Sequence, residues 1–200
     1  MTNVALNSVL VLASASPRRR ELLERVGVPC EVVPADIDET PHGGESPVEY
    51  VTRIATAKAR AVYLENRWVL AADTTVAIDG AIFGKASSEQ EASAMLRQLS
   101  GRSHHVITAF AIAGSAWHCD VVTTEVAMVA IDDATVVDYL ATGEWRGKAG
   151  AYAIQGIAAA FVRAVHGSVT NVIGLPLAEV LASLRALGAP CADIRRGIPA

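Results

Sequence analysis

The chain contains few cysteines, the residues that stabilise many small proteins through disulfides or bound zinc. It has three cysteines among 200 residues, and Cys30, Cys119 and Cys191 are far apart and odd in number, so neither a disulfide framework nor a zinc knuckle is indicated. We expect free thiols in a reducing cytoplasm. Because 200 residues can bury a sizeable core without such cross-links, the sequence predicts one domain spanning 1–200.

Aromatic residues and an excess of positive charge are also lacking. Aromatics make up 5% of the chain, and 17 Lys and Arg are outnumbered by 21 Asp and Glu, which gives a formal net charge of −4. Binding to nucleic acid needs a basic surface or stacking aromatics, so we expect no nucleic-acid partner. No apolar run is long enough to span a bilayer and no secretory leader is recognised, which predicts a cytoplasmic protein without a membrane partner. The hydrophobic content of 52% exceeds what this size requires and favours a homodimer.

The hydrophobic periodicity alternates between strands and helices. Strands are predicted near 8–13, 30–34, 68–72, 103–113, 117–131 and 160–166, with a hairpin around Asp79-Gly80. Helices are predicted over 17–27, 47–64, from a capping box at Ser88 and Glu91 to about Leu99, over 133–141, and after Gly174-Leu175-Pro176. This order predicts an α/β fold with a mixed sheet of long antiparallel strands flanked by helices. The loop from Pro34 to Ser46 is the longest polar interruption, and such loops are often functional.

An arginine-rich segment, Ser14-Ala15-Ser16-Pro17-Arg18-Arg19-Arg20, follows the first predicted strand. Ser16 fits the cap of a helix and Pro17 its first position, but the partial positive charge of a helix start should repel a row of arginines. Backbone N–H groups and cations directed to one place indicate an anion site. The alternative is an arginine-rich, solvated helix start.

The three arginines differ in the partners that helical spacing offers them. Arg20 can pair with Glu24 four residues on, and Arg18 with Glu21 three residues on. Arg19 faces only leucines at these offsets. We therefore predict that Arg19 is the least compensated of the three.

Two further charged residues interrupt apolar patterns. Lys58 falls on the apolar stripe of the helix predicted from Pro47; either its stem packs and its ammonium reaches solvent, or it lines a cleft and meets an anion. Asp73 follows an apolar run, at the predicted C-terminal end of a buried strand, where ligand sites of α/β sheets are common. The alternative for Asp73 is an acid that bonds to its own turn.

Two shorter patterns carry little chemistry by themselves. Gly84-Lys85 lacks the spacing and the hydroxyl of a phosphate-binding P-loop, so Lys85 is either a surface residue or a phosphate ligand. His104 and His105 are neighbours on a predicted strand and therefore point to opposite faces. They cannot chelate one metal ion together, and a structural role is favoured.

These residues together resemble the Maf proteins, the septum-formation-inhibitor family of nucleoside triphosphate pyrophosphatases. The resemblance covers nearly the whole chain. The matching segments, in order, are Ala13–Arg19, Ile37–Glu39, Ala57–Ala59, Ala72–Val76, Gly84-Lys85, Leu99–Gly101, Lys148–Gly156 and Gly174–Leu177. The family implies two lobes around a deep cleft, a Maf/ITPase-like arrangement, and the hydrolysis of a nucleoside triphosphate to the monophosphate and pyrophosphate with a divalent metal.

The resemblance also implies which residues form the site. The proton-accepting carboxylate would be Asp73, and Mg²⁺ or Mn²⁺ would be held by Asp73 and Glu39. The residues implied to bind the nucleotide are Ser16, Arg18, Arg19, Lys58, Thr74, Lys85 and Gln155. Arg18, Thr74 and Ile154-Gln155-Gly156 look like the branch that acts on dTTP and UTP. Ala86 departs from the family pattern, in which proline follows the lysine, and we expect a looser loop around Lys85.

A function from a different class stays open at this point. The protein could be a nucleotide-binding regulator of cell division that acts through protein contacts, with the nucleotide as a switch. Such a regulator would bind nucleotide without releasing pyrophosphate, whereas the enzyme would release it.

Overall fold

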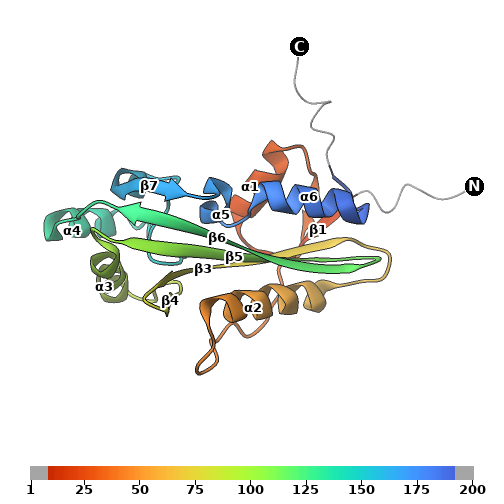
Figure 1. Ribbon diagram of the computed structural model, residues 1–200, viewed down its shortest axis with the longest axis horizontal. Coiled ribbons are helices and arrows are strands. Elements are labelled where there is room, and N and C mark those ends of the chain that lie inside the picture. Colours follow the sequence, from red (N-terminus) through yellow and green to blue (C-terminus); the bar gives the residue numbers. More distant parts are fainter. Residues whose placement is uncertain (1–8, 192–200) are drawn as a thin grey trace, which may run out of the picture.

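The computed structural model describes residues 9–191 (Figure 1). Its strands are β1 (Leu10–Leu12), β2 (Cys30–Val32), β3 (Val69–Ile78), β4 (Ala81–Phe83), β5 (Ser103–Ala113), β6 (Trp117–Met128) and β7 (Val162–His166). Its helices are α1 (Pro17–Arg25), α2 (Pro47–Val62), α3 (Glu89–Leu99), α4 (Asp133–Ala141), the 3-10 helix η1 (Ile157–Phe161), α5 (Val169–Ile173) and α6 (Leu177–Leu187). The predicted start of the first strand at Ser8 lies outside the described residues.

Within the described residues the strands form one mixed sheet of seven. The order is β2-β1-β3-β5-β6-β7, with β4 paired to β3. β1 pairs in parallel with β2 and β3, while β3, β5, β6 and β7 pair antiparallel. The predicted α/β class with long antiparallel strands is confirmed.

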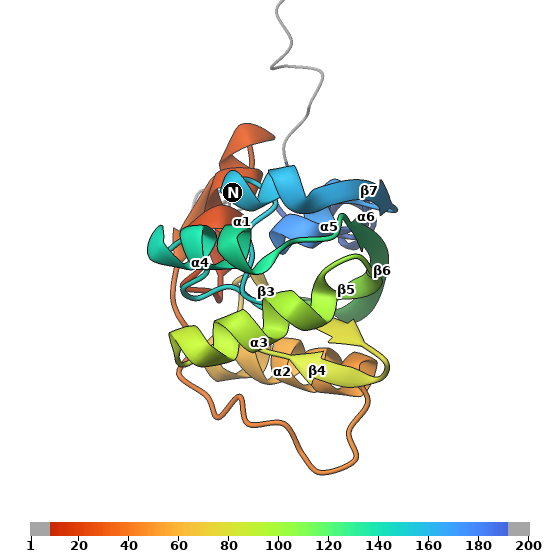
Figure 2. The same ribbon diagram turned by 90° about the vertical axis from the view of Figure 1, so that its left-hand side faces the viewer.

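Helices cover both faces of the sheet. α1, α5 and α6 lie over one face, and α2 and α3 lie over the other (Figures 1 and 2). Alternation along the strands explains this arrangement, because Leu70 and Ala72 pack with the cluster under α1 and α6, whereas Val69 and Ala71 pack with the cluster under α2. Both faces of these strands are therefore apolar and buried.

A further apolar cluster occupies the end of the sheet near α3 and α4. It contains Val76 and Ile78 from β3 together with Leu96, Leu99 and Trp145. The first half of β3 packs into the clusters under α1, α6 and α2, and its second half packs mainly into the cluster near α3 and α4. The middle of β3 therefore lies where these clusters meet. The polar residues Asp73, Thr74 and Thr75 occupy that middle.

The predicted end of the third strand was wrong. β3 continues through Asp73 to Ile78, and Asp73 is paired with Ala109 of β5. The apolar run stops at Ala72, but the β-branched residues Thr74 to Val76 suit an extended backbone and carry the strand onward. The backbone of Asp73 is therefore held within the sheet by the pairing of β3 with β5, and Asp73 does not lie at a strand end.

Caps place several helices as expected, with one difference. Ser88 Oγ accepts from the Glu91 N–H at 3.2 Å, but the Glu91 carboxylate accepts from the N–H and hydroxyl of Ser87, each at 2.7 Å, and does not close the predicted box. The complete capping box lies at Ser46 and Glu49, at the start of α2. Among the described residues, no helix combines the length and the apolar character needed to cross a bilayer.

Candidate active site

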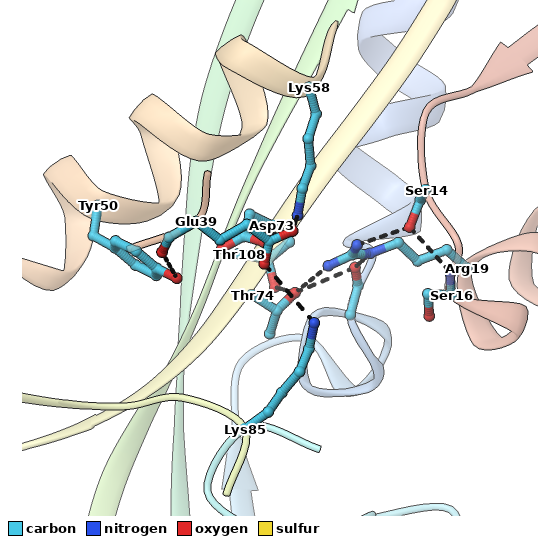
Figure 3. A network of polar contacts seen from close by, with 11 residues as sticks. Ser14, Ser16, Arg19, Glu39, Tyr50, Lys58, Asp73, Thr74, Lys85 and Thr108 are labelled. Carbon is cyan, nitrogen blue, oxygen red and sulfur yellow. Dashed lines mark hydrogen bonds and ion pairs between the residues drawn. The ribbon is translucent and has the colours of Figure 1, made fainter. Parts of the chain in front are cut away.

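A cavity of about 440 Å³ lies beside the middle of β3. Every residue that the sequence implied for the site lines it: Ser16, Arg18, Arg19, Glu39, Lys58, Asp73, Thr74, Lys85 and Gln155. They come from the turn before α1, the first turn of α1, the loop before α2, α2 itself, β3 and two loops near α3 and α4. Figure 3 shows the side chains of this region pointing toward one another.

Lys58 joins the two carboxylates of this group. Its Nζ lies 2.8 Å from Asp73 Oδ1 and 2.7 Å from Glu39 Oε1 (Figure 3). Lys58 and Asp73 are 7% and 6% exposed, so this pair is buried. Lys58 lines the cleft and meets an anion, which is one of the two alternatives that the sequence left open. Asp73 lies within a strand, so it is not an acid bonded to its own turn.

Glu39 sits between two lysines. Lys85 Nζ lies 3.8 Å from Glu39 Oε2, whereas Lys58 binds the other oxygen, Oε1. Partial burial by itself would raise the pKa of Glu39, but the hydrogen bond from Lys58 and the nearby cations Lys58, Lys85 and Arg19 outweigh it and lower the pKa. Glu39 is therefore an anion at neutral pH.

The loop that carries Glu39 is tied to α2. The Tyr50 hydroxyl donates to the main-chain oxygen of Glu39 at 3.1 Å, and Arg53 donates to the main-chain oxygen of Thr40 at 3.1 Å. Arg53 also binds both oxygens of Glu45, at 2.6 and 2.7 Å, and this hydrogen bonding lowers the pKa of Glu45 to about 2. The sequence marked the loop as long and polar but gave no sign of this attachment.

Arg19 is compensated by neutral oxygens, contrary to the expectation drawn from helical spacing. Its guanidinium donates to Gly174 O at 2.7 Å and to Ser14 Oγ and Thr74 Oγ1 at 3.0 Å each. Burial lowers the pKa of Arg19, and the charge of Asp73 works in the opposite direction. The partners were missed because they lie on other elements, beyond the reach of a helical offset rule.

Arg18 is the less satisfied arginine. In the part of the chain that the structure describes, the Arg18 side chain forms no hydrogen bond or ion pair, and the predicted partner Glu21 lies instead 3.9 Å from Arg25. The predicted pair of Arg20 and Glu24 is present at 2.7 Å. Burial lowers the pKa of Arg18, and Glu21 partly offsets this effect at longer range. Arg18 therefore presents an unpaired guanidinium to the cavity.

Thr74 and Ser16 have different surroundings. The Thr74 hydroxyl is already hydrogen-bonded, to Arg19 and to Thr108 Oγ1 at 2.9 Å. Ser16 occupies the cap position of α1, but its side chain forms no capping bond to the described residues. Its backbone N–H donates to Ser14 Oγ at 3.2 Å. The Ser16 hydroxyl is thus the more available of the two.

The loops on the far side of the cavity are tied to each other. Lys85 and Ala149 form an isolated antiparallel bridge, and Gly150 N donates to Gly84 O at 3.1 Å. Ala86, where the family pattern has proline, packs against the cluster near α3 and α4. This bridge fixes the backbone of Lys85, which the expectation of a looser loop had not foreseen.

Sequence reasoning missed two cations and an aromatic residue that line the cavity, namely Arg146, Lys148 and Tyr152. Burial lowers the pKa of Lys148, and the neighbouring charge of Arg18 lowers it further. Lys148 is the first residue of the family-matching segment Lys148–Gly156. Its position in that segment, two residues before a glycine, was the sequence signal that could have marked it as a site residue. His104 and His105 point to opposite faces as expected, since the first is buried and the second exposed.

The acidic groups of the cavity suit a metal that arrives with a polyphosphate. Among residues 9–191, no cluster of three or more His, Cys, Asp or Glu forms a ready metal cage. Mg²⁺ is commonly bound by one or two carboxylates together with phosphate oxygens and water. Asp73 and Glu39, held within reach of one ammonium, fit this pattern.

The model of the Maf-like protein family matches residues 9–187. This chain belongs to the Maf family. It is 50% identical over 190 residues to the dTTP/UTP pyrophosphatase of Citrifermentans bemidjiense, covering 92% of this chain and 97% of that protein. It is 49% identical over 185 residues to the dTTP/UTP pyrophosphatase of Myxococcus xanthus, covering 92% and 94%.

Solved structures include a weaker match. The Ham1 protein of Staphylococcus aureus is 16% identical, and the match covers 60% of this chain and 71% of that one with a TM-score of 0.42. Membership of the Maf family rests on the family model and the close relatives, and the cavity described above lies within the matched residues.

Proposed function

We propose that this protein hydrolyses nucleoside triphosphates, above all dTTP and UTP, to the nucleoside monophosphate and pyrophosphate. The observation that carries the proposal is the buried contact of Asp73 with Lys58, beside Glu39 and a set of cations in one cavity. The names of the close relatives, dTTP/UTP pyrophosphatase, support the same activity.

The cations match the charge of a triphosphate. Such a group carries about four negative charges, and cations with hydrogen-bond donors bind it strongly. Arg18, Lys85 and Lys148 all line the cavity, and the start of α1 adds its N–H groups. Arg19 contributes chiefly by holding the wall, because three of its N–H groups are already used inside the protein.

Asp73 acts as the proton acceptor. Its carboxylate takes a proton from water as the water oxygen bonds to the α-phosphorus, and the bond from this phosphorus to the α,β-bridging oxygen breaks. Pyrophosphate leaves with the bonding electrons, and Lys85 and Arg18 stabilise its charge. Lys58 holds Asp73 and Glu39 in place throughout. A divalent cation, Mg²⁺ or Mn²⁺, bound by Asp73 and Glu39 would supply Lewis-acid polarisation of the phosphate oxygens.

Gln155 is proposed to contact the base of the nucleotide. The exposed amide of Gln155 has both a donor and an acceptor, as the edge of a pyrimidine has. Thr74 has a smaller direct role, because its hydroxyl is bonded within the protein. The Ser16 hydroxyl is available to a phosphate oxygen.

The regulator of cell division is the less favoured alternative. The relatives are named for an enzymatic activity, and a buried acid held by a lysine is what hydrolysis needs but simple nucleotide binding does not. The homodimer and the cytoplasmic location expected from the sequence stay predictions.

The decisive experiment incubates the purified protein with Mg²⁺ or Mn²⁺ and a panel of triphosphates, and identifies the released phosphate. We expect pyrophosphate, fastest from dTTP and UTP. Asp73→Asn should lower kcat at least ~10²-fold, whereas Asp79→Asn, at an exposed pair with Arg102, should leave it unchanged. Orthophosphate alone, or a fully active Asp73→Asn protein, would contradict the proposal.

A further inference from the structure

Glu144 lies outside the cavity but holds the turn that presents Gln155 to it. It follows α4 in the chain and reaches across to the start of η1. Its Oε2 accepts the N–H of Ile157 at 2.8 Å, and its Oε1 accepts the N–H of Ala158 at 3.2 Å. These are the two residues that follow the Gln155-Gly156 turn.

This carboxylate serves as the cap that η1 lacks. The cap position of η1 is Gly156, which has no side chain to satisfy the free N–H groups. A negative charge beside such groups is favourable. A Cβ atom on Gly156 would lie 2.0 Å from Glu144 Oε2, so glycine is required where the carboxylate sits.

Glu144 is itself held from the side of α4. The Tyr139 hydroxyl donates to Glu144 Oε1 at 3.1 Å, and the N–H of Glu144 donates to Thr142 Oγ1 at 3.2 Å. Tyr139 is 2% exposed, and its ring packs edge-on against Phe161 at the other end of η1. The carboxylate therefore links the buried Tyr139 to one turn of the cavity wall.

We propose that Glu144 is a positioning residue for Gln155 and thereby sets the preference of the site among pyrimidine bases. The inference rests on the proposed function, in which Gln155 meets the base. The amide of a glutamine can turn to match either the uracil or the cytosine edge. A backbone held at a fixed place limits the positions from which the amide can meet a base edge, and the bonds from Ile157 and Ala158 to Glu144 hold that backbone.

The test compares Glu144→Ala with a matched loss of a cap elsewhere. Asp132 caps α4 by accepting the Thr135 N–H at 2.7 Å, so Asp132→Ala removes a similar bond without touching the turn. Glu144→Gln keeps one acceptor oxygen and should recover part of the effect. For each protein, kcat and KM are measured with UTP and CTP, and amide hydrogen exchange is measured at Ile157 and Ala158.

We expect Glu144→Ala to speed exchange at both amides and to reduce the preference for UTP over CTP roughly tenfold, because small displacements at a site have effects of this size. Gln155→Ala should reduce the preference similarly, and the double variant should be no worse. Asp132→Ala should leave the preference unchanged. Unchanged preference in Glu144→Ala, or a reduction equal to that in Asp132→Ala, would overturn the inference.

The result separates this inference from the proposed function. If the wild-type protein releases no pyrophosphate from any triphosphate, the proposed function fails, and the exchange data alone report whether Glu144 holds the turn. If Gln155→Ala lowers the preference and Glu144→Ala does not, the activity stands and the positioning role is lost.

Discussion

Arg19 Nε donates to the main-chain oxygen of Gly174 across 2.7 Å, although 155 positions separate the two residues. The other ends of the guanidinium donate to Ser14 Oγ and Thr74 Oγ1. The planar fork of arginine suits this task because its donors point in several fixed directions. The turn before α1, the middle of β3 and the loop before α6 thus meet on one side chain, and the shape of the cavity depends on it.

Arg19→Lys should therefore destabilise the protein. A lysine ammonium cannot reach all three acceptors, and we expect the free energy of unfolding to fall by about 3 kcal/mol. Arg20→Lys is the matched control on the same helix, since Arg20 forms an exposed pair with Glu24, and it should change stability by less than about 0.5 kcal/mol. Urea unfolding measures both. Equal, small effects would show that Arg19 does not join these segments.

Much of the fold could be predicted because its signals are local. The cap at Ser88 and the turn at Asp79-Gly80 each need only a few neighbouring residues, and both are where the sequence places them. α5 was missed because its five residues, Val169–Ile173, are too short to show a helical period. The end of β3 was misplaced because polar residues inside a sheet interrupt the apolar pattern without ending the strand.

The candidate site was predictable where a residue broke its local pattern. Lys58 on an apolar helix face and Asp73 after an apolar run were visible as anomalies, and both lie in the cavity. The contacts that hold them were not visible, because they join residues far apart in the chain. Arg19 donates to the main-chain oxygen of Gly174, and a pattern of side chains in the sequence cannot predict which backbone oxygen accepts such a bond.

Lys58→Met should remove the shared cation of the two carboxylates. Breaking one side of a buried pair costs roughly 3–5 kcal/mol of stability, and kcat should fall at least ~10²-fold because the Asp73 carboxylate is no longer held in place by Lys58. The double variant Lys58→Met/Asp73→Asn should recover much of the stability and none of the activity. Thermal unfolding and pyrophosphate release distinguish the two effects. A double variant less stable than either single variant would contradict the pairing.

Arg53→Gln should loosen the loop that carries Glu39. The bonds from Arg53 to Glu45 and to Thr40 would be lost, so amide exchange over residues 38–45 should speed up, and kcat/KM should fall roughly tenfold, as for other supports of a metal ligand. Arg60→Gln is the control, because Arg60 lies on the same helix over the Trp117 ring, away from the loop. If both variants behave alike, the loop does not depend on Arg53.

His104 should make the protein less stable as the pH falls from about 6.5 to 4. It is 1% exposed, its Nε2 lies 2.8 Å from the Tyr152 hydroxyl, and burial, with a smaller effect of His105, lowers its pKa to about 4. Between pH 6.5 and 4 the unfolded chain therefore binds a proton that the folded protein does not, so the free energy of unfolding decreases as the pH is lowered. The loss across this range is of the order of 3 kcal/mol.

His104→Gln keeps a polar partner for Tyr152 but does not titrate, so its stability should vary less with pH, whereas the exposed His105→Gln should follow the wild type. Urea unfolding at about pH 7, 5.5 and 4.5 measures the three slopes, and a His104→Gln protein as sensitive to acid as the wild type would assign the effect to another group.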